Sequence, residues 1–424
     1  MIQTGERSKA LEVKYIKALS KFLWSIGAWP GEEFGDSVAL PIRFQRLTLP
    51  YQCAGILAAQ IYYLVNHRTN IRFFDVGHVI INCFLTLATG TRTALPSFKG
   101  YTLIVKKFIN DFHLIHFKDK GEYDEKVYKI TDFVSYYFTI MQMTLMVCGM
   151  TLFNMSPLYN DYRMGAFSRH RPPNITMDFA VFYEFPGATQ DEHFYAATFL
   201  NLWLSWNCSV SVCSIDLLLS LMVFQIIGHI RILMYDFENL ERPKSSESVK
   251  TEGEESLVPV TVELFDRQEN MRVHRKLIDM VIRHRLIVEF ADDISSFFGP
   301  LLALTYSFHL VSLCILLLEC SQNDPQALAR FLPLTAIIFG ELVQISVVFE
   351  VVGYMGEKLI DSVYLSPWEC MNVSNQKSMK FILSRIQLPL QVTAMGMVPV
   401  GVETMTAIIK TTMSFFAILQ SIND

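Results

Sequence analysis

The sequence contains few charged residues and no recognisable catalytic motif. Only 18% of its 424 residues are charged, against about 25% in an average soluble protein. It has no nucleophile elbow, P-loop, Gly-rich dinucleotide loop or metal-spaced set of His and Cys. No basic cluster interleaves with aromatic residues, so the net charge of −5 does not indicate nucleic-acid binding. We therefore expect no enzyme, no cofactor and no nucleic-acid partner.

The eight cysteines form neither a disulfide pattern nor a zinc-finger spacing. Most of them lie inside apolar runs, where a reduced cysteine behaves as a small hydrophobic residue. The first 20 residues contain no apolar stretch like that of a signal peptide. We therefore expect the cysteines to be free and buried.

Hydrophobic residues, in contrast, make up 51% of the chain, with 32 Phe and a mean hydropathy of +0.29. A membrane span needs about 20 mostly apolar residues, and seven windows meet this requirement. They are residues 47–66, 73–94, 132–154, 196–228, 296–319, 330–354 and 394–420. The predicted fold class is all-α, a seven-transmembrane helical membrane protein. The fourth window is too long for a perpendicular span, so its helix is expected to tilt or to project from the bilayer.

Lys and Arg concentrate on one side of this arrangement. The segment before the first span and the segments after the even-numbered spans, together with Arg92, hold 29 of them, and the opposite loops hold six. Cytoplasmic loops are enriched in Lys and Arg. The N-terminus is therefore predicted to be cytoplasmic and the C-terminus extracellular.

The spans divide the chain into four predicted parts. Residues 1–46 form a cytoplasmic N-terminal segment, and 47–228 hold spans one to four with the outer loop 155–195. Residues 229–295 form a cytoplasmic loop and a long helix, and 296–424 hold spans five to seven.

Two of these parts carry further local signals. In the N-terminal segment the apolar residues Leu11, Tyr15, Leu19, Phe22 and Ile26 mark an amphipathic helix, expected at the membrane surface. Residues 242–263 are polar and rich in Ser and Glu, so a mobile loop is expected there.

Four Asn-x-Ser/Thr sequons are present. Asn174 lies in the predicted outer loop and is the expected glycosylation site.

Seven spans suggest a G-protein-coupled receptor as one alternative. Three features argue against it: the N-terminus is predicted inside, no Asp-Arg-Tyr follows the third span and no Asn-Pro-x-x-Tyr closes the seventh, and loop 155–195 has no cysteine. A secondary transporter is the other alternative. Transporters usually show Gly- or Pro-broken spans in both halves, and we do not see this pattern.

Four stretches in order resemble the insect odorant receptor family. They are "SIGAWP" at 25–30, "IRHRLIVEFADDISSFFGPLL" at 282–302, "FEVVGYMGEKL" at 349–359 and "IIKTTMSFFAILQ" at 408–420. Within the family, "MSPLYNDYRMGAF" at 155–167 and "SIDLLLSLMVFQIIGHI" at 214–230 look most like the moth sex-pheromone receptor branch.

This resemblance implies the subunit of an odorant-gated, non-selective cation channel, a heterotetramer with the olfactory co-receptor. It implies a volatile long-chain alcohol, aldehyde or acetate as ligand, and the plasma membrane of a sensory neuron dendrite as the location. The C-terminal part, 296–424, would then contain an anchor region and the pore helix.

The resemblance also implies a ligand pocket among the outer halves of spans two, three, four and six. Aromatic and flexible apolar side chains suit such a ligand. Ordinary helix packing explains any one of them better, whereas a pocket explains the set better. The candidates are Phe73, Phe74 and His78; Met143, Met146, Met150 and Phe153; Phe199, Trp203 and Trp206; and Phe331, Leu334 and Ile338. His78 could donate a hydrogen bond to an odorant oxygen, and the alternative is a buried histidine that bonds within the protein.

Lys410 lies in the middle of the last apolar window. Together with Glu403, Thr406 and Ser414 it forms a polar stripe on one face of a helix. Facing lipid, this lysine would cost at least about 2.5 kcal/mol. We therefore predict that the stripe lines the pore. The alternative is that Lys410 extends outward to the membrane surface or bonds a polar group on a neighbouring helix.

Two acidic residues also fall inside predicted spans. Asp216 is expected to make an interhelical hydrogen bond, and Glu341 is left open between packing and function.

Overall fold

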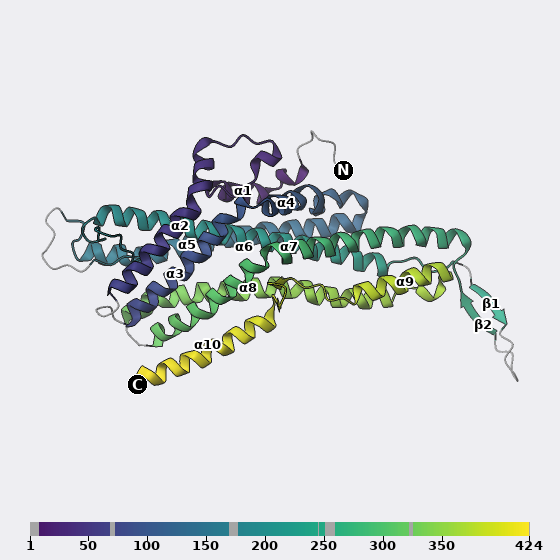
Figure 1. Cartoon of the computed structure of the whole chain (residues 1–424). Coiled ribbons are helices and arrows are strands. Elements are labelled where there is room, and N and C mark those ends of the chain that lie inside the picture. The colour runs from purple at the N-terminus through teal and green to yellow at the C-terminus, as the bar shows by residue number, and fades with distance from the viewer. Residues whose placement is uncertain are drawn as a thin grey trace.

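The structure is a computed structural model, and it describes residues 8–67, 73–168, 177–244, 246–250, 259–321 and 325–423. Long helices run side by side and form an elongated bundle (Figure 1). The α-helices are α1 (Lys14–Ser25), α2 (Leu40–His67), α3 (Phe73–Ala94), α4 (Lys99–Lys107), α5 (Glu122–Arg163), α6 (Phe194–Glu238), α7 (Arg267–Ser321), α8 (Pro325–Tyr364), α9 (Val373–Ile386) and α10 (Val402–Asn423). The short helical turns are η1 (Lys9–Glu12), η2 (Gly31–Phe34), η3 (Leu95–Ser97), η4 (Phe108–Phe112), η5 (Leu114–His116), η6 (Lys118–Lys120) and η7 (Trp368–Cys370).

Each of the seven predicted windows falls largely within one helix: α2, α3, α5, α6, α7, α8 and α10. Among the described residues, α5, α6, α7 and α8 are long and apolar enough to cross a membrane by length and composition. These four helices continue well beyond their windows, and α6, at 45 residues, is longer than a perpendicular span requires. We call the end of the bundle that carries residues 177–190 the outer end, and the end that carries α9 the inner end.

α6 is the central helix of the bundle. It contacts α1, α3, α5, α7 and α8, and its inner half is buried on every side, as the run Leu217–Val223 illustrates. A helix that is apolar all round belongs in the interior of a bundle. The helices that contact α6 therefore pack around it.

The start of the seventh window was predicted wrongly. Residues 394–401 are not helical: β3 (Thr393–Ala394) pairs antiparallel with β4 (Val398–Pro399), and α10 begins only at Val402. Gly396 turns the hairpin with φ +69°, a conformation that glycine adopts without strain. Thr393 N–H donates to Ser295 Oγ of α7 at 3.2 Å, which fixes the hairpin to the bundle.

The predicted mobile loop at 242–263 contains paired strands. β1 (Ser246–Lys250) pairs antiparallel with β2 (Pro259–Glu263), so that Ser246 lies opposite Glu263. The hairpin projects from the inner end (Figure 1), and residues 251–258 lie outside the described part. After it, α7 is one continuous helix of 55 residues that runs into the fifth predicted span, as the sequence indicated.

The N-terminal amphipathic helix exists, but its apolar face packs against protein. Tyr15, Ile16 and Leu19 are almost fully buried, and α1 contacts α5 and α6. Our placement of this apolar face at the membrane surface is therefore corrected. The helix ends where Gly27 takes φ +70°. A side chain there would also collide with the backbone of Arg46, so the tight exit requires glycine.

Arg92 is buried in the bundle and is not an exposed inner-side charge. Its side chain is 2% exposed and pairs with Asp216 of α6, with Nη2 2.9 Å from Oδ1 and 3.0 Å from Oδ2. Asp216 therefore makes the interhelical bond we expected, and the inner-side total of basic residues falls to 28. The bias that favours a cytoplasmic N-terminus hardly changes.

A second buried polar cluster joins α1 to the inner loops. The hydroxyl oxygen of Tyr15 lies 2.7 Å from Nε2 of His113 and accepts a further bond from Gln225 Nε2 at 3.1 Å. His113 Nδ1 accepts from Ile115 N–H at 3.1 Å, so the ring is neutral and Nε2–H donates to Tyr15. Burial, followed by the nearby His116 and His229, lowers the pKa of His113 to about 3.

This lowered pKa predicts acid sensitivity. A neutral histidine stabilises the fold above its unfolded pKa of about 6.5, and the contribution is lost as the pH falls towards 3. Between pH 7.5 and 5, His113 should remove about 2 kcal/mol from the free energy of unfolding. In His113→Asn the amide oxygen can still accept from Ile115 N–H. At pH 7.5 this variant should have a free energy of unfolding about 1 kcal/mol below that of wild type, because the bond to Tyr15 is lost. It should therefore unfold at a lower temperature.

Thermal unfolding of the purified protein across this pH range measures the effect. Wild type should lose about 2 kcal/mol between pH 7.5 and 5 through His113, and His113→Asn should not. The wild-type advantage of about 1 kcal/mol at pH 7.5 should therefore shrink as the pH falls and reverse before pH 5. Two curves that stay parallel from pH 7.5 to 5 would show that His113 does not carry the acid sensitivity.

Candidate functional site

Three of the predicted pocket residues come together near the outer end of the bundle. The ring centroids of Phe153 on α5 and Phe331 on α8 lie 6.3 and 5.9 Å from that of His78 on α3. A fourth ring, Phe182 of the outer loop, meets His78 edge-on at 6.1 Å. We call these four residues the His78 cluster. It joins three helices and the loop through one imidazole.

The outer loop is fixed to this cluster by hydrogen bonds. The carbonyl oxygen of Ala180 accepts from His78 Nε2 at 3.0 Å and from Asn82 Nδ2 at 3.3 Å. Glu184 N–H donates to the carbonyl of Ala59 on α2 at 3.2 Å. His78 therefore uses Nε2 to hold the loop, and a bond from this atom to an odorant oxygen would have to replace the bond to Ala180.

The other inward-facing candidates pack around the bundle interior. Met146 and Ile338 are buried, and Met143, Trp206 and Leu334 are half-buried against the same core. Met150 is half-buried on α5. These side chains lie in the region where α5, α6 and α8 pack against one another.

Two candidates face outward instead. Phe199 is 71% exposed and Trp203 is 38% exposed, and Trp203 Nε1 donates to Gln52 Oε1 of α2 at 3.5 Å. On an apolar helix such as α6, composition does not mark which side faces inward. The side chains of Phe73 and Phe74 lie outside the described residues.

Sequence reasoning missed Phe182 and Asn82. Asn82 follows His78 by four residues, a spacing that puts both on one face of α3, and this signal was available. Phe182 lies in an irregular segment without periodicity, so the sequence contained no signal for it.

The polar stripe on α10 lies on the open side of that helix. Glu403, Lys410 and Ser414 are exposed and Thr406 is half-buried, whereas Ile408 and Thr412 are buried on the opposite face. α10 packs on α7 and α8 and lies along one edge of the bundle (Figure 1). The stripe therefore faces away from the rest of the described chain.

The described sequons are poor acceptors for a glycan. Asn154 and Asn207 are buried, and Asn372 caps α9 by accepting from Asn375 N–H at 2.9 Å. Asn174 lies outside the described residues, so its glycosylation stays a prediction.

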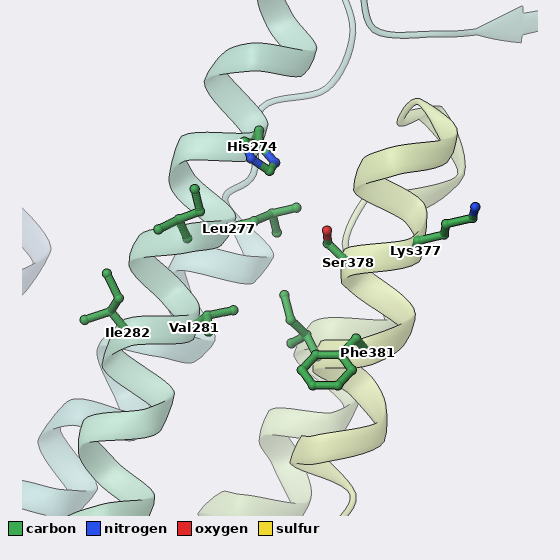
Figure 2. Close-up of a pocket in the computed structure, with 9 residues that line it drawn as sticks. His274, Leu277, Val281, Ile282, Lys377, Ser378 and Phe381 are labelled. Atoms are coloured by element: carbon green, nitrogen blue, oxygen red, sulfur yellow. The ribbon is translucent and has the colours of Figure 1, made fainter.

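A groove of about 390 Å³ lies between α7 and α9 at the inner end, away from the His78 cluster. Val281 of α7 points toward α9, and Phe381 lies on the side of α9 that faces α7 (Figure 2). The groove walls are mostly apolar: Leu277, Ile278, Val281 and Ile282 of α7, with Phe381 and Ile382 of α9. Several of these side chains are exposed, and Ile282 reaches 61%. We call this surface the inner groove.

Comparison with known proteins connects these features. The family model described as "7tm Odorant receptor" matches residues 65–413. The chain belongs to the 7tm odorant receptor family. It is accordingly a membrane-embedded odorant receptor and not an enzyme, and its fold class is the seven-helix fold that the sequence predicted.

A solved structure, the insect olfactory receptor OR5 from Machilis hrabei, has the same fold. The chain matches it with a TM-score of 0.74 and 13% identity, over 96% of this chain and 97% of that one. The same receptor in complex with eugenol gives a TM-score of 0.72 at 12% identity, over 97% and 99%. At this identity the likeness shows the fold alone.

Among curated proteins, Odorant receptor 30a of Drosophila melanogaster is 26% identical over 165 residues. The match covers 37% of this chain and 44% of that receptor, so it spans less than half of the relative's length.

Proposed function

We propose that this odorant receptor is the ligand-binding subunit of an odorant-gated, non-selective cation channel, assembled with the olfactory co-receptor. The proposed ligand is a volatile long-chain alcohol, aldehyde or acetate of the sex-pheromone type. The observation that carries the proposal is the combination, in one subunit, of a buried aromatic cluster at the outer end and a membrane helix with an open polar stripe.

The His78 cluster is suited to a small, largely apolar ligand. Its rings come from α3, α5, α8 and the outer loop, so a molecule inserted among them would contact all four segments at once. Aromatic and methionine side chains supply large contact surfaces with few polar demands. The Machilis receptor, which has the same fold, is known in complex with eugenol, and this supports a small organic ligand.

The stripe on α10 supports a role in permeation. A lysine that faces lipid would cost at least about 2.5 kcal/mol, and Lys410 is on the face of α10 opposite to the one packed against α7. A water-filled pore bounded by several subunits would hydrate this charge. The other stripe residues, Glu403, Thr406 and Ser414, would line the same path.

The inner groove supports assembly. Exposed apolar patches of this kind usually mark an interaction surface, and Ile282 and Phe381 are both more than half exposed. The proposed occupant is the corresponding α7–α9 surface of a neighbouring subunit. In subunits that stand side by side in one membrane, these apolar surfaces would lie at the same depth and could bury each other.

The bias of 28 basic residues against six supports a cytoplasmic N-terminus and an extracellular C-terminus. The proposed location is the plasma membrane of a sensory neuron dendrite.

Current recording tests the proposal as a whole. Cells that express this chain with the co-receptor should respond to at least one member of a panel of long-chain alcohols, aldehydes and acetates. Cells with either chain alone should respond little. Phe381→Asp should lower the response and the recovery of mixed complexes, because it puts a charge into the inner groove. Val373→Asp is the control, since Val373 is equally exposed on α9 but does not line the groove. Equal loss in both variants would argue against the groove as the interface.

The ligand site has its own test. Phe331→Ala removes one ring from the His78 cluster and should lower odorant sensitivity roughly 5- to 150-fold, the equivalent of about 1–3 kcal/mol. Phe199→Ala makes the same change at an exposed position of α6 and should leave the dose-response curve within about 2-fold. Surface expression is measured for both. A larger shift for Phe199→Ala than for Phe331→Ala would move the ligand site elsewhere.

Lys410→Gln tests the pore. The change keeps the approximate size of the side chain and removes its charge. Two unit charges about 4 Å apart interact by about 1 kcal/mol even in bulk water, so reversal potentials in sodium and calcium solutions should shift while the odorant concentration for half-maximal current moves less. Unchanged reversal potentials together with lost assembly would make Lys410 a packing residue.

A further inference from the structure

The buried Arg92–Asp216 pair extends to a third helix. Arg92 Nη2 donates to both carboxylate oxygens of Asp216, at 2.9 and 3.0 Å, and to Thr305 Oγ1 of α7 at 3.1 Å. Arg92 Nε adds a bond to Asp216 Oδ1 at 3.3 Å. The Thr305 hydroxyl donates a hydrogen bond to the Leu301 carbonyl oxygen at 2.9 Å. Its oxygen is therefore oriented to accept from Arg92. The guanidinium thus fixes α3, α6 and α7 to one another.

Arg92 belongs to the same helix as the His78 cluster. His78 and Arg92 are 14 residues apart on α3, which is continuous from Phe73 to Ala94, and this corresponds to about 21 Å of helix. An unbroken helix of this length moves nearly as a rigid rod. A displacement of the His78 cluster at one end therefore also displaces the Arg92–Asp216 pair at the other.

On the far side, Thr305 is adjacent to a chain of contacts that ends at α10. The next residue, Tyr306, lies with its hydroxyl 3.4 Å from Ser346 Oγ on α8. One turn further along α8, Glu350 Oε2 accepts from the N–H of Val402, the first residue of α10, at 2.8 Å. The start of the proposed pore helix is thus held by the helix that contacts Tyr306.

We propose that Arg92, Asp216 and Thr305 are positioning residues for channel opening, which couple the odorant-binding end of α3 to the start of α10. This inference rests on the proposed channel function. A paired charge in a low-dielectric interior is costly to separate, so the pair moves as one body. When α3 shifts, α6 and α7 shift with it, and Tyr306 and Glu350 carry the shift to Val402.

Thr305→Val is the sharpest variant, because it removes only the hydroxyl that Arg92 bonds and keeps the shape. Thr305→Ser restores the hydroxyl. Ser307→Ala is the matched control: Ser307 lies two residues further along α7, is exposed, and bonds only the Ala303 carbonyl among the described residues. Each variant is expressed with the co-receptor, and surface expression, maximal current and half-maximal odorant concentration are measured.

Coupling energies between sites typically correspond to about 5-fold or more in an equilibrium constant. Thr305→Val should therefore lower the maximal current of a weak agonist by about 5-fold or more, with normal surface expression and with less effect on a strong agonist. Thr305→Ser should recover the current, and Ser307→Ala should match wild type. Phe331→Ala and Thr305→Val combined should be non-additive, as residues in one network are.

Wild-type maximal currents in Thr305→Val, with additive behaviour in the double variant, would overturn the coupling and leave the proposed channel function intact. No odorant current from the wild type with its co-receptor would overturn both. If Thr305→Val does not reach the surface, Arg92→Lys replaces it, since lysine keeps the charge but cannot make the two-pronged contact. Full maximal currents in Arg92→Lys would then count against the proposal.

Discussion

A bilayer interior offers no hydrogen-bond partners, and this constraint shapes the chain more than any single contact does. Backbone groups must be satisfied within a segment, so the membrane part is helical. Polar side chains must also find partners inside the protein. Thr198, Thr305 and Thr406 donate to the carbonyl four residues earlier, and Ser205 donates to Asn154 across the α5–α6 interface at 3.2 Å. Arg92 and Asp216 follow the same rule with full charges.

This rule applies only to the part of each helix that lies in the membrane. Helices α6 and α7, with 45 and 55 residues, are longer than a membrane span and continue beyond it at the inner end. There the helices pack as in a soluble bundle: Ile287 and Phe290 of α7 are fully buried, and Phe290 stacks on Phe112 with ring centroids 4.0 Å apart. Charged pairs appear at the surface, as between Lys276 and Glu241 at 3.3 Å. One chain thus combines a lipid-facing part with a water-facing part, and the long helices α6 and α7 are continuous through both.

The sequence predicted the features that hydropathy records and missed those that depend on distant partners. Seven apolar windows became seven helices because spanning a membrane demands about 20 apolar residues each. The partner of Arg92 is 124 residues away, and no local pattern connects the two. Phe199 and Trp203 were placed with Trp206, since α6 is apolar on all sides and its inward face cannot be read from composition. Residues 394–399 were read as helix from their hydropathy, although Gly396 and Pro399 favour a turn.

Helix α10 lies at the edge of the bundle, and this position has a physical consequence. It contacts α7 and α8 on one face only, and on the other it presents Lys410, Glu403 and Ser414. A single subunit in a bilayer would expose these groups to lipid, which is unfavourable by several kcal/mol in total. This cost is avoided if the open face of α10 contacts water or polar groups of other chains. The His78 cluster forms within one chain, whereas the open face of α10 lacks partners from its own chain among the described residues. The proposed sites of recognition and conduction therefore lie in regions with different structural requirements.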